Sequence, residues 1–235
     1  MFDAPLYHLV FSHQAKAIYG PVPKAACSTL KAYFRRAAGL GEIDFDLLHR
    51  RRLNGLLYAS AIERGELIRL LFTDAGYFKF TVVRNPFTRL VSAWRDLLAP
   101  RDDGQCRHQA EAERLLETHR RIADLRPSDC GSLTFETFVR LLPALDPAKM
   151  DRHWQPQTLV NYSDVIAYDL VVKLEELAER WGEIRDRLAF QEELGAPVNV
   201  GGAIDPGAWF TPELAEIART VYADDFRQLG YDTAL

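Results

Sequence analysis

Sulfur is scarce in this chain of 235 residues, which contains three cysteines and two methionines. The cysteines, Cys27, Cys106 and Cys130, are odd in number, and their spacing suits neither a disulfide framework nor a zinc site. Nothing in the first twenty residues approaches a membrane span of roughly 18–20 apolar residues or the layout of a signal peptide. We therefore expect a cytoplasmic protein without an integral membrane segment.

An excess of basic charge is also missing. The 29 Lys and Arg residues against 33 Asp and Glu give a formal net charge of −4. This balance argues against general nucleic-acid binding, which needs a strongly basic face. No internal repeat, low-complexity tract or long linker divides the chain, and 48% hydrophobic residues suffice for one large core. We expect a single domain over residues 1–235, and no feature of the sequence indicates an oligomeric state.

The chain does contain a turn of small and hydroxyl residues between a strand and a helix. Residues 17–22 are mostly apolar and predict a buried strand, and from Leu30 onward apolar residues recur at the spacing of one helix face. The turn over residues 23–29 lets a phosphate approach the backbone, and it adds the charge of Lys24 and the hydroxyl of Ser28. The two glycines of a Walker A loop are absent. Taken alone, the stretch is also compatible with an ordinary turn that carries a solvated lysine.

A second unit of the same kind follows. Residues 78–83 predict a core strand, and Asn85 followed by proline is a favourable helix start. Arg84 therefore stands at the carboxyl end of a strand, and Ser92 lies about two turns into the next helix. Because ligands of open parallel sheets bind at the carboxyl ends of strands, we expect Arg84 to face the same crevice as the Lys24 loop.

These stretches resemble the donor-binding motifs of sulfotransferases. Residues 22–31 (VPKAACSTLK) are similar to the loop that binds the 5′-phosphosulfate, and residues 78–96 (FKFTVVRNPFTRLVSAWRD) to the motif that binds the 3′-phosphate. Residues 151–175 and 222–231 resemble the runs HWxPQ…YDxIxKxE and YxxDFxxFGY of the carbohydrate branch, the chondroitin, dermatan and HNK-1 type. The resemblance spans about residues 16–232, with its four motifs in order.

The resemblance implies the P-loop nucleotide-kinase-like sulfotransferase fold, an α/β fold with a central parallel sheet flanked by helices. It also implies the donor 3′-phosphoadenosine 5′-phosphosulfate (PAPS), the product PAP, no metal, and transfer of a sulfuryl group to an acceptor hydroxyl, foremost on a carbohydrate. Lys24 would stabilise charge on the leaving phosphate. The expected donor-binding residues are Pro23, Lys24, Ala25, Ala26, Cys27, Ser28, Thr29, Leu30, Arg84 and Ser92.

The acceptor hydroxyl needs a base, and histidine has a suitable unperturbed pKa. Four of the six histidines stand in terminal or highly charged contexts that are typical of surface residues: His8, His13, His108 and His119. In the related 2-O-sulfotransferases a catalytic histidine occupies a place similar to that of His49. His153 belongs to the HWxPQ-like run, and it either acts on the acceptor or packs beside Trp154. Both are catalytic candidates, and His49 is favoured.

Other functions stay open on the sequence alone. The acceptor could be a tyrosine, a peptide or a small hydroxylated metabolite. A P-loop kinase would share the fold but needs a Walker lysine and a magnesium-binding carboxylate, which do not occur in the right context. A non-catalytic nucleotide-binding domain would bind adenosine bisphosphate and transfer nothing.

Overall fold

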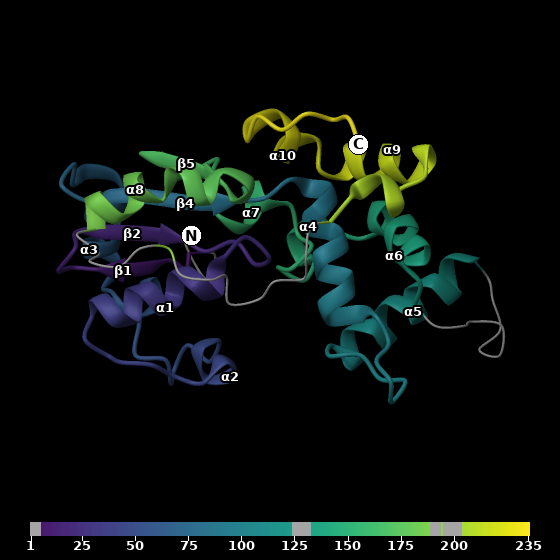
Figure 1. Ribbon diagram of the computed structural model, residues 1–235, viewed down its shortest axis with the longest axis horizontal. Coiled ribbons are helices and arrows are strands. Elements are labelled where there is room, and N and C mark those ends of the chain that lie inside the picture. Colours follow the sequence, from purple (N-terminus) through teal and green to yellow (C-terminus); the bar gives the residue numbers. More distant parts are fainter. Residues whose placement is uncertain (1–5, 124–132, 189–193, 195–203) are drawn as a thin grey trace. The chain divides into compact units, whose positions relative to one another are not determined.

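The chain divides into two compact units, here called unit 1 and unit 2 (Figure 1). The computed structural model describes residues 6–123, 133–188, 194 and 204–235. Unit 1 comprises residues 1–84 and 157–200, and unit 2 comprises residues 85–156 and 201–235. The first division falls directly after Arg84. That the whole chain forms a single domain stays a prediction.

Unit 1, as far as it is described, is built around a five-stranded sheet with the strand order β3-β1-β2-β4-β5. Its strands are β1 (Val10–Ser12), β2 (Ala17–Gly20), β3 (Leu57–Tyr58), β4 (Phe78–Val83) and β5 (Leu170–Lys173). Its helices are α1 (Cys27–Ala37), α2 (Phe45–Leu48), α3 (Arg64–Ile68), α7 (Gln157–Val160) and α8 (Leu177–Leu188). The strand predicted over residues 78–83 is confirmed as β4.

The sheet is parallel at its centre and antiparallel at one edge. β4 pairs in parallel with β2 and with β5, whereas β1 pairs antiparallel with β2 and β3. The parallel centre confirms the expected α/β class. The antiparallel edge was not predicted. The pairing of β1 with β2 follows from a short connection: Lys16 has a φ of 45°, and its N–H donates to the carbonyl of His13 at 3.3 Å. A link this short joins only antiparallel strands.

Helices cover both faces of this sheet. On one face the rings of Tyr19 and Phe80 stack at 5.0 Å, and Phe34 of α1 lies 5.9 Å from Tyr19. On the same side Tyr33 of α1 meets Trp181 of α8 at 4.7 Å, and Figure 1 shows α1 running alongside the strands. The other face packs into a second buried cluster that includes Phe11, Ile18, Leu70 and Leu71. Alternation along β2 thus sends neighbouring side chains into two cores.

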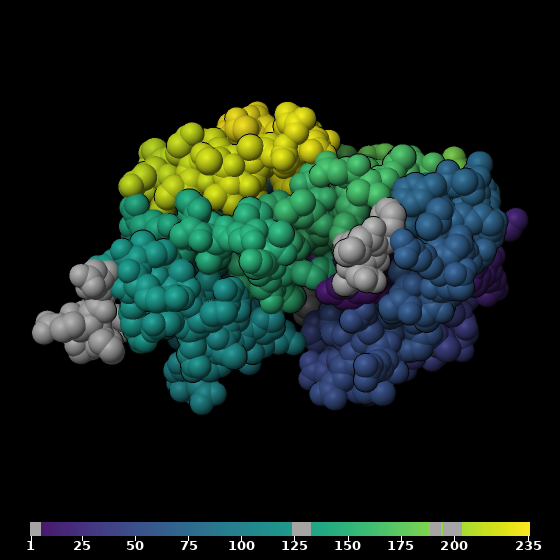
Figure 2. All heavy atoms as spheres, turned by 180° about the vertical axis from the view of Figure 1, so that it is seen from behind, coloured from purple at the N-terminus to yellow at the C-terminus, as the bar shows by residue number. Residues whose placement is uncertain are grey.

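The described part of unit 2 is helical. Its helices are α4 (Pro86–Ala93), α5 (Gln109–Ala123), α6 (Phe135–Leu141), α9 (Pro212–Val221) and α10 (Ala223–Gln228). The predicted start of α4 is confirmed, because the Asn85 side chain accepts hydrogen bonds from the N–H groups of Phe87 and Thr88. Tyr222 separates the two C-terminal helices, α9 and α10. α9 packs on α6, and Figure 2 shows the yellow C-terminal helices lying on the teal part of unit 2.

No helix among the described residues combines the length and the apolar character needed to cross a membrane. Cys27 and Cys106 are both free thiols and partly exposed, and Cys130 lies outside the described residues. The cytoplasmic location stays a prediction.

Gly20 at the end of β2 is expected to resist any side chain. A Cβ built there would lie 2.9 Å from the ring carbon that bears the Tyr168 hydroxyl, and that hydroxyl is held by a 2.6 Å hydrogen bond to the carbonyl of Asn161. Gly20→Ala should therefore lower the free energy of unfolding by about 1–3 kcal/mol through overpacking. Urea denaturation measures this loss.

Gly182 in α8 is the matched control, because an added Cβ there meets nothing within 4 Å. Gly182→Ala should be neutral or raise the free energy of unfolding by about 0.5–1 kcal/mol, since alanine favours a helix interior. Equal effects of the two substitutions would contradict the close approach of Tyr168.

Candidate active site

The loop between β2 and α1 has a strained backbone. Two of its residues adopt the left-handed region, Lys24 with φ 70° and Ala26 with φ 56°. Such conformations cost roughly 1–3 kcal/mol each in residues other than glycine and gather at functional sites. They let the chain turn quickly, so that α1 starts at Cys27 and the predicted turn over residues 23–29 is too long. Ser28 and Thr29 consequently lie in the first turn of the helix.

The start of α1 fits an anion. Its N-cap is Ala26, which has no side-chain oxygen to offer to the first N–H groups of the helix. An N-terminus of this kind attracts phosphate through its N–H groups and its dipole. Of the eight expected donor-binding residues from Pro23 to Leu30, five are partly exposed: Pro23, Lys24, Ala26, Cys27 and Ser28. Three are buried: Ala25, Thr29 and Leu30. Contact of each with a donor stays a prediction.

Arg84 reaches this loop from the end of β4. Its Nη1 donates a hydrogen bond of 3.1 Å to the carbonyl oxygen of Lys24. Arg84 and the Lys24 loop are therefore neighbours within unit 1, and the shared crevice expected for them stays a prediction. Ser92 lies half-buried on α4 in unit 2, and its contact with a phosphate stays a prediction.

Gln157 was missed by sequence reasoning although it closes the HWxPQ-like run. Its fully buried amide holds the backbone of Arg84 from both sides. The N–H of Arg84 donates to Oε1 at 2.8 Å, and Nε2 donates to the carbonyl of Arg84 at 2.7 Å. A side-chain amide suits this position because its oxygen accepts and its nitrogen donates. Gln157 therefore holds Arg84, the last residue of the first segment of unit 1.

His49 lies beside the same loop. Its Nε2 is 2.9 Å from the hydroxyl oxygen of Ser28, and its ring contacts Phe45 at 4.8 Å between centroids. His49 is exposed, at the end of the short helix α2. The structure thus brings two predicted site residues together, His49 and Ser28.

Buried polar side chains hold the segment that carries His49. Asn54 is fully buried and donates at 2.8 Å both to the carbonyl of Leu48 and to the hydroxyl of Tyr58. Arg35 of α1, 6% exposed, donates to the carbonyls of Asn54 and Leu40. These bonds satisfy irregular backbone that has no ladder partner, and they tie α2 to α1.

His153 lies in unit 2 and pairs with an acidic residue. Its Nδ1 is 2.6 Å from Oδ1 of Asp151, and its N–H donates to the same oxygen at 2.9 Å. Burial would raise the pKa of Asp151, but the hydrogen bond and charge of His153 outweigh burial, and the pKa lies below its ordinary value. The carboxylate is therefore ionised at neutral pH and accepts the hydrogen on Nδ1.

Two histidines assigned to the surface are partly or fully buried. His108 is half-buried, and its ring meets that of His153 edge to face at 5.3 Å. Burial lowers the pKa of His108, and the charge of His153 adds to this effect. His8 is 3% exposed, and its Nε2 donates to the carbonyl of Val160 at 2.7 Å within unit 1. The charged residues near these histidines in the sequence gave a wrong prediction, because they do not report which side chains are buried in the folded protein.

Among the described residues, one group of three side chains could hold a metal ion: His108, Asp151 and His153. One nitrogen or oxygen atom from each lies within 4.8 Å of the other two. The direct contact of 2.6 Å between His153 and Asp151 is too short for two ligands of one tetrahedral zinc ion, which lie about 3.3 Å apart at ordinary bond lengths. The geometry is that of a hydrogen-bonded pair with a neighbouring imidazole.

Arg89 fixes the turn that carries this pair. It is 2% exposed and donates to the carbonyls of Arg152 and Gln155, each at 2.8 Å. Its burial excludes a surface ion pair, and both of these bonds stay within unit 2.

Comparison with known proteins identifies relatives over most of the chain. The model of the Sulfotransferase family matches residues 7–232. Carbohydrate sulfotransferase 14 of Homo sapiens is 34% identical over 213 residues, which are 90% of this chain and 52% of that protein. Carbohydrate sulfotransferase 8 of Homo sapiens is 32% identical over 70% of this chain and 38% of its own length.

Carbohydrate sulfotransferase 11 of Rattus norvegicus is 31% identical over 74% of this chain and 51% of its own length. The chain therefore spans about half the length of the first of these relatives. No solved structure matches. The resemblance read from the four sequence motifs is confirmed.

The amide of Gln157 should contribute measurably to stability. We expect Gln157→Ala to lower the free energy of unfolding by about 1–3 kcal/mol, because both backbone groups of Arg84 lose their partner. Gln155→Ala is the matched control, since its side chain makes one exposed bond to the carbonyl of Pro147 at 2.9 Å. Urea unfolding compares the two variants. An equal loss in both would show that the Arg84 bonds carry no particular stability.

Proposed function

Since the chain belongs to the Sulfotransferase family, we propose that it transfers a sulfuryl group from PAPS to a hydroxyl group of a carbohydrate. One observation carries the donor side of this proposal: the hydrogen bond from Arg84 to the left-handed loop residue Lys24, beside the uncapped start of α1. The acceptor class rests on the relatives, which are carbohydrate sulfotransferases.

The 5′-phosphate of the donor would bind at the first turn of α1. There the N–H groups of the turn and the Lys24 ammonium would stabilise the charge that develops on this phosphate as the bond to sulfur breaks. Fixed donors of this kind lower the barrier because they need no reorganisation during transfer. The reaction then depends on positioning and charge, as in phosphoryl transfer. No step in this account calls for a metal ion.

The Ser28–His49 hydrogen bond supports a donor-side role for His49. Its Nε2 shares a hydrogen bond of 2.9 Å with the hydroxyl of Ser28, in the first turn of α1. We therefore propose that His49 orients Ser28 toward the donor, whereas the sequence had favoured it as the base. The cytoplasm is the proposed location, on the grounds of cysteine usage.

Two acceptor classes compete. The second candidate acceptor is a tyrosine side chain or a small hydroxylated metabolite, which the same donor chemistry would serve. Radiosulfate transfer from PAPS to desulfated glycans, tyrosine peptides and phenols separates these classes. Binding of PAP without transfer to any acceptor would identify a nucleotide-binding domain instead, and transfer of phosphate from ATP would identify a kinase.

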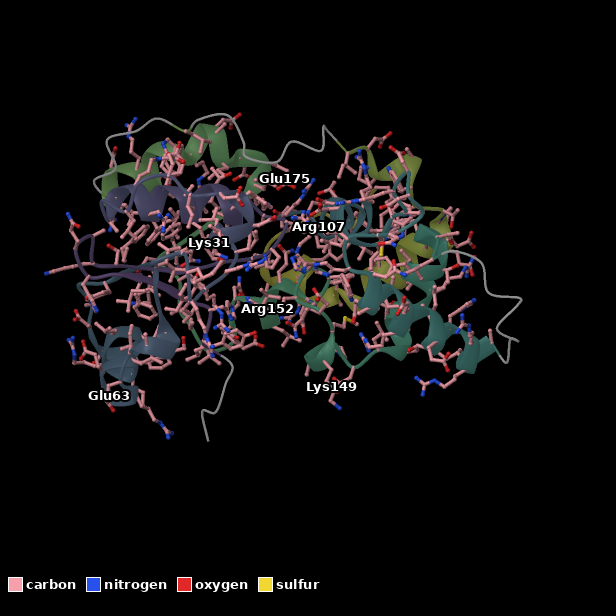
Figure 3. The ribbon with its side chains drawn as sticks, turned by 90° about the horizontal axis from the view of Figure 1, so that it is seen from below. Lys31, Glu63, Arg107, Lys149, Arg152 and Glu175 are labelled. Atoms are coloured by element: carbon pink, nitrogen blue, oxygen red, sulfur yellow. The ribbon has the colours of Figure 1, made fainter. Side chains whose placement is uncertain are left out.

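Lys24→Ala should lower turnover by roughly 10²–10³-fold, the usual cost of losing one group that stabilises developing charge. The measurement is radiosulfate transfer at saturating donor and acceptor. Lys149→Ala is the matched control: this lysine has a side chain 84% exposed, pairs with Asp146, and points away from unit 2 (Figure 3). Near-normal turnover of Lys24→Ala would overturn the assignment of the phosphosulfate loop.

The 3′-phosphate should dominate donor affinity. We expect the protein to prefer PAP over adenosine 5′-monophosphate by ~10²–10⁴-fold, because Arg84 and Ser92 would each donate a hydrogen bond to the charged 3′-phosphate. Calorimetry should show Arg84→Ala reducing this preference by at least about tenfold and Ser92→Ala by about tenfold. Arg227→Ala, whose side chain is 71% exposed, should leave it unchanged. Equal affinity for the two nucleotides would refute the assignment.

A further inference from the structure

The Asp151–His153 pair has the geometry that prepares an imidazole to accept a proton. An ionised carboxylate only accepts hydrogen bonds, so the 2.6 Å contact requires the ring hydrogen of neutral His153 to lie on Nδ1. Nε2 then carries the lone pair. The side chain of His153 is 32% exposed and that of Asp151 is 29% exposed. Solvent and small groups therefore have access to the pair.

The turn under this pair is rigid. The N–H groups of Trp154 and Gln155 donate to the carbonyl of Asp151 at 3.1 and 2.8 Å. Trp154 is fully buried against Phe138, and its carbonyl accepts a hydrogen bond from the buried hydroxyl of Tyr222. Since the backbone cannot easily move, the carboxylate holds one orientation of the imidazole.

His108 completes the surroundings without adding a charge. Its N–H donates to the carbonyl of Leu97 at 2.9 Å, and its carbonyl accepts from the N–H groups of Glu111 and Ala112 at 3.1 and 3.0 Å. The residue is thereby fixed at the start of α5. Burial lowers its pKa, with the neighbouring His153 as the next cause, so His108 is neutral near pH 7. The His108 ring, whose centroid lies 5.3 Å from that of His153, therefore adds no charge beside it. The charged group that is hydrogen-bonded to His153 is Asp151.

We propose that Asp151 is a positioning residue that fixes His153 as the catalytic base, an inference that rests on the sulfuryl transfer proposed above. Nε2 of His153 removes the proton of the acceptor hydroxyl as its oxygen forms a bond to sulfur. The bond between sulfur and the 5′-phosphate oxygen of the donor breaks, and its electron pair leaves with the phosphate. Asp151 stays ionised and stabilises the imidazolium that results.

The tautomer of His153 can be read without any reaction. In nitrogen-15 spectra of the intact protein with labelled histidine, His153 should carry its hydrogen on Nδ1, and Asp151→Ala should abolish this preference. Asp146→Ala is the matched control, because this exposed aspartate caps the turn at Ala148 and pairs with Lys149. If the tautomer of His153 were the same in Asp151→Ala as in the unaltered protein, Asp151 would not position the imidazole, and the inference would be overturned whatever the protein transfers.

Kinetics then tests the base. With saturating donor and acceptor, His153→Ala should lose about 10²–10⁴-fold in turnover while the affinity for PAP holds, and added imidazole should restore part of the loss. Asp151→Ala and the nearly isosteric Asp151→Asn should lower turnover by about 10–10³-fold at unchanged PAP affinity. His49→Ala should instead weaken donor binding.

The outcomes separate the two proposals. Transfer by the unaltered protein together with near-normal turnover of His153→Ala overturns the assignment of the base and leaves the proposed function standing. A dead His49→Ala with normal PAP affinity would assign the base to His49. If a chelator abolished turnover and added zinc restored it, Asp151 and His153 would be metal ligands and not a hydrogen-bonded pair. Absence of transfer to every acceptor defeats the proposed function, while the tautomer measurement still decides the role of Asp151.

Discussion

Parallel pairing of β2 with β4 is the constraint on which the donor side depends. The register places Gly20 opposite Thr81, and the buried hydroxyl of Thr81 donates to the carbonyl of Gly20 at 2.7 Å. Both strands therefore end at one edge of the sheet. The two segments that follow them are brought within hydrogen-bond distance there, as the bond from Arg84 to Lys24 shows. Two residues that are sixty positions apart in the chain, Lys24 and Arg84, are thereby in direct contact.

Buried polar side chains perform the remaining positioning. Gln157 holds the backbone of Arg84, Asn54 holds the segment that carries His49, and Arg89 holds the turn that carries His153. Each binds backbone that lies outside regular ladders and would otherwise be left without partners. A buried amide or guanidinium with several directed bonds is well suited to this task because its donors point in fixed directions. The proposed site thus depends on residues to which the proposed reaction assigns no chemical step.

The two candidate histidines have different hydrogen-bond partners. His49 is exposed and shares its Nε2 with a hydroxyl group, whereas His153 is half-buried and shares its Nδ1 with a carboxylate. A hydroxyl partner can donate or accept, so it does not select one tautomer. A carboxylate selects one, and its charge favours the imidazolium that forms when a proton is taken. This difference, rather than the distance of either residue from a motif, is the basis for the two proposed roles.

What the sequence determined is local. The core strand at Phe78–Val83, the Asn85 cap and the family of the chain followed from alternation, capping chemistry and four ordered motifs. The left-handed residues Lys24 and Ala26, the antiparallel edge and the burial of His8 did not, because propensity and charge density report only neighbours in the chain. Tertiary structure alone decided that Gln157 clamps Arg84, since partners 73 residues apart meet only once the sheet has fixed where both segments lie.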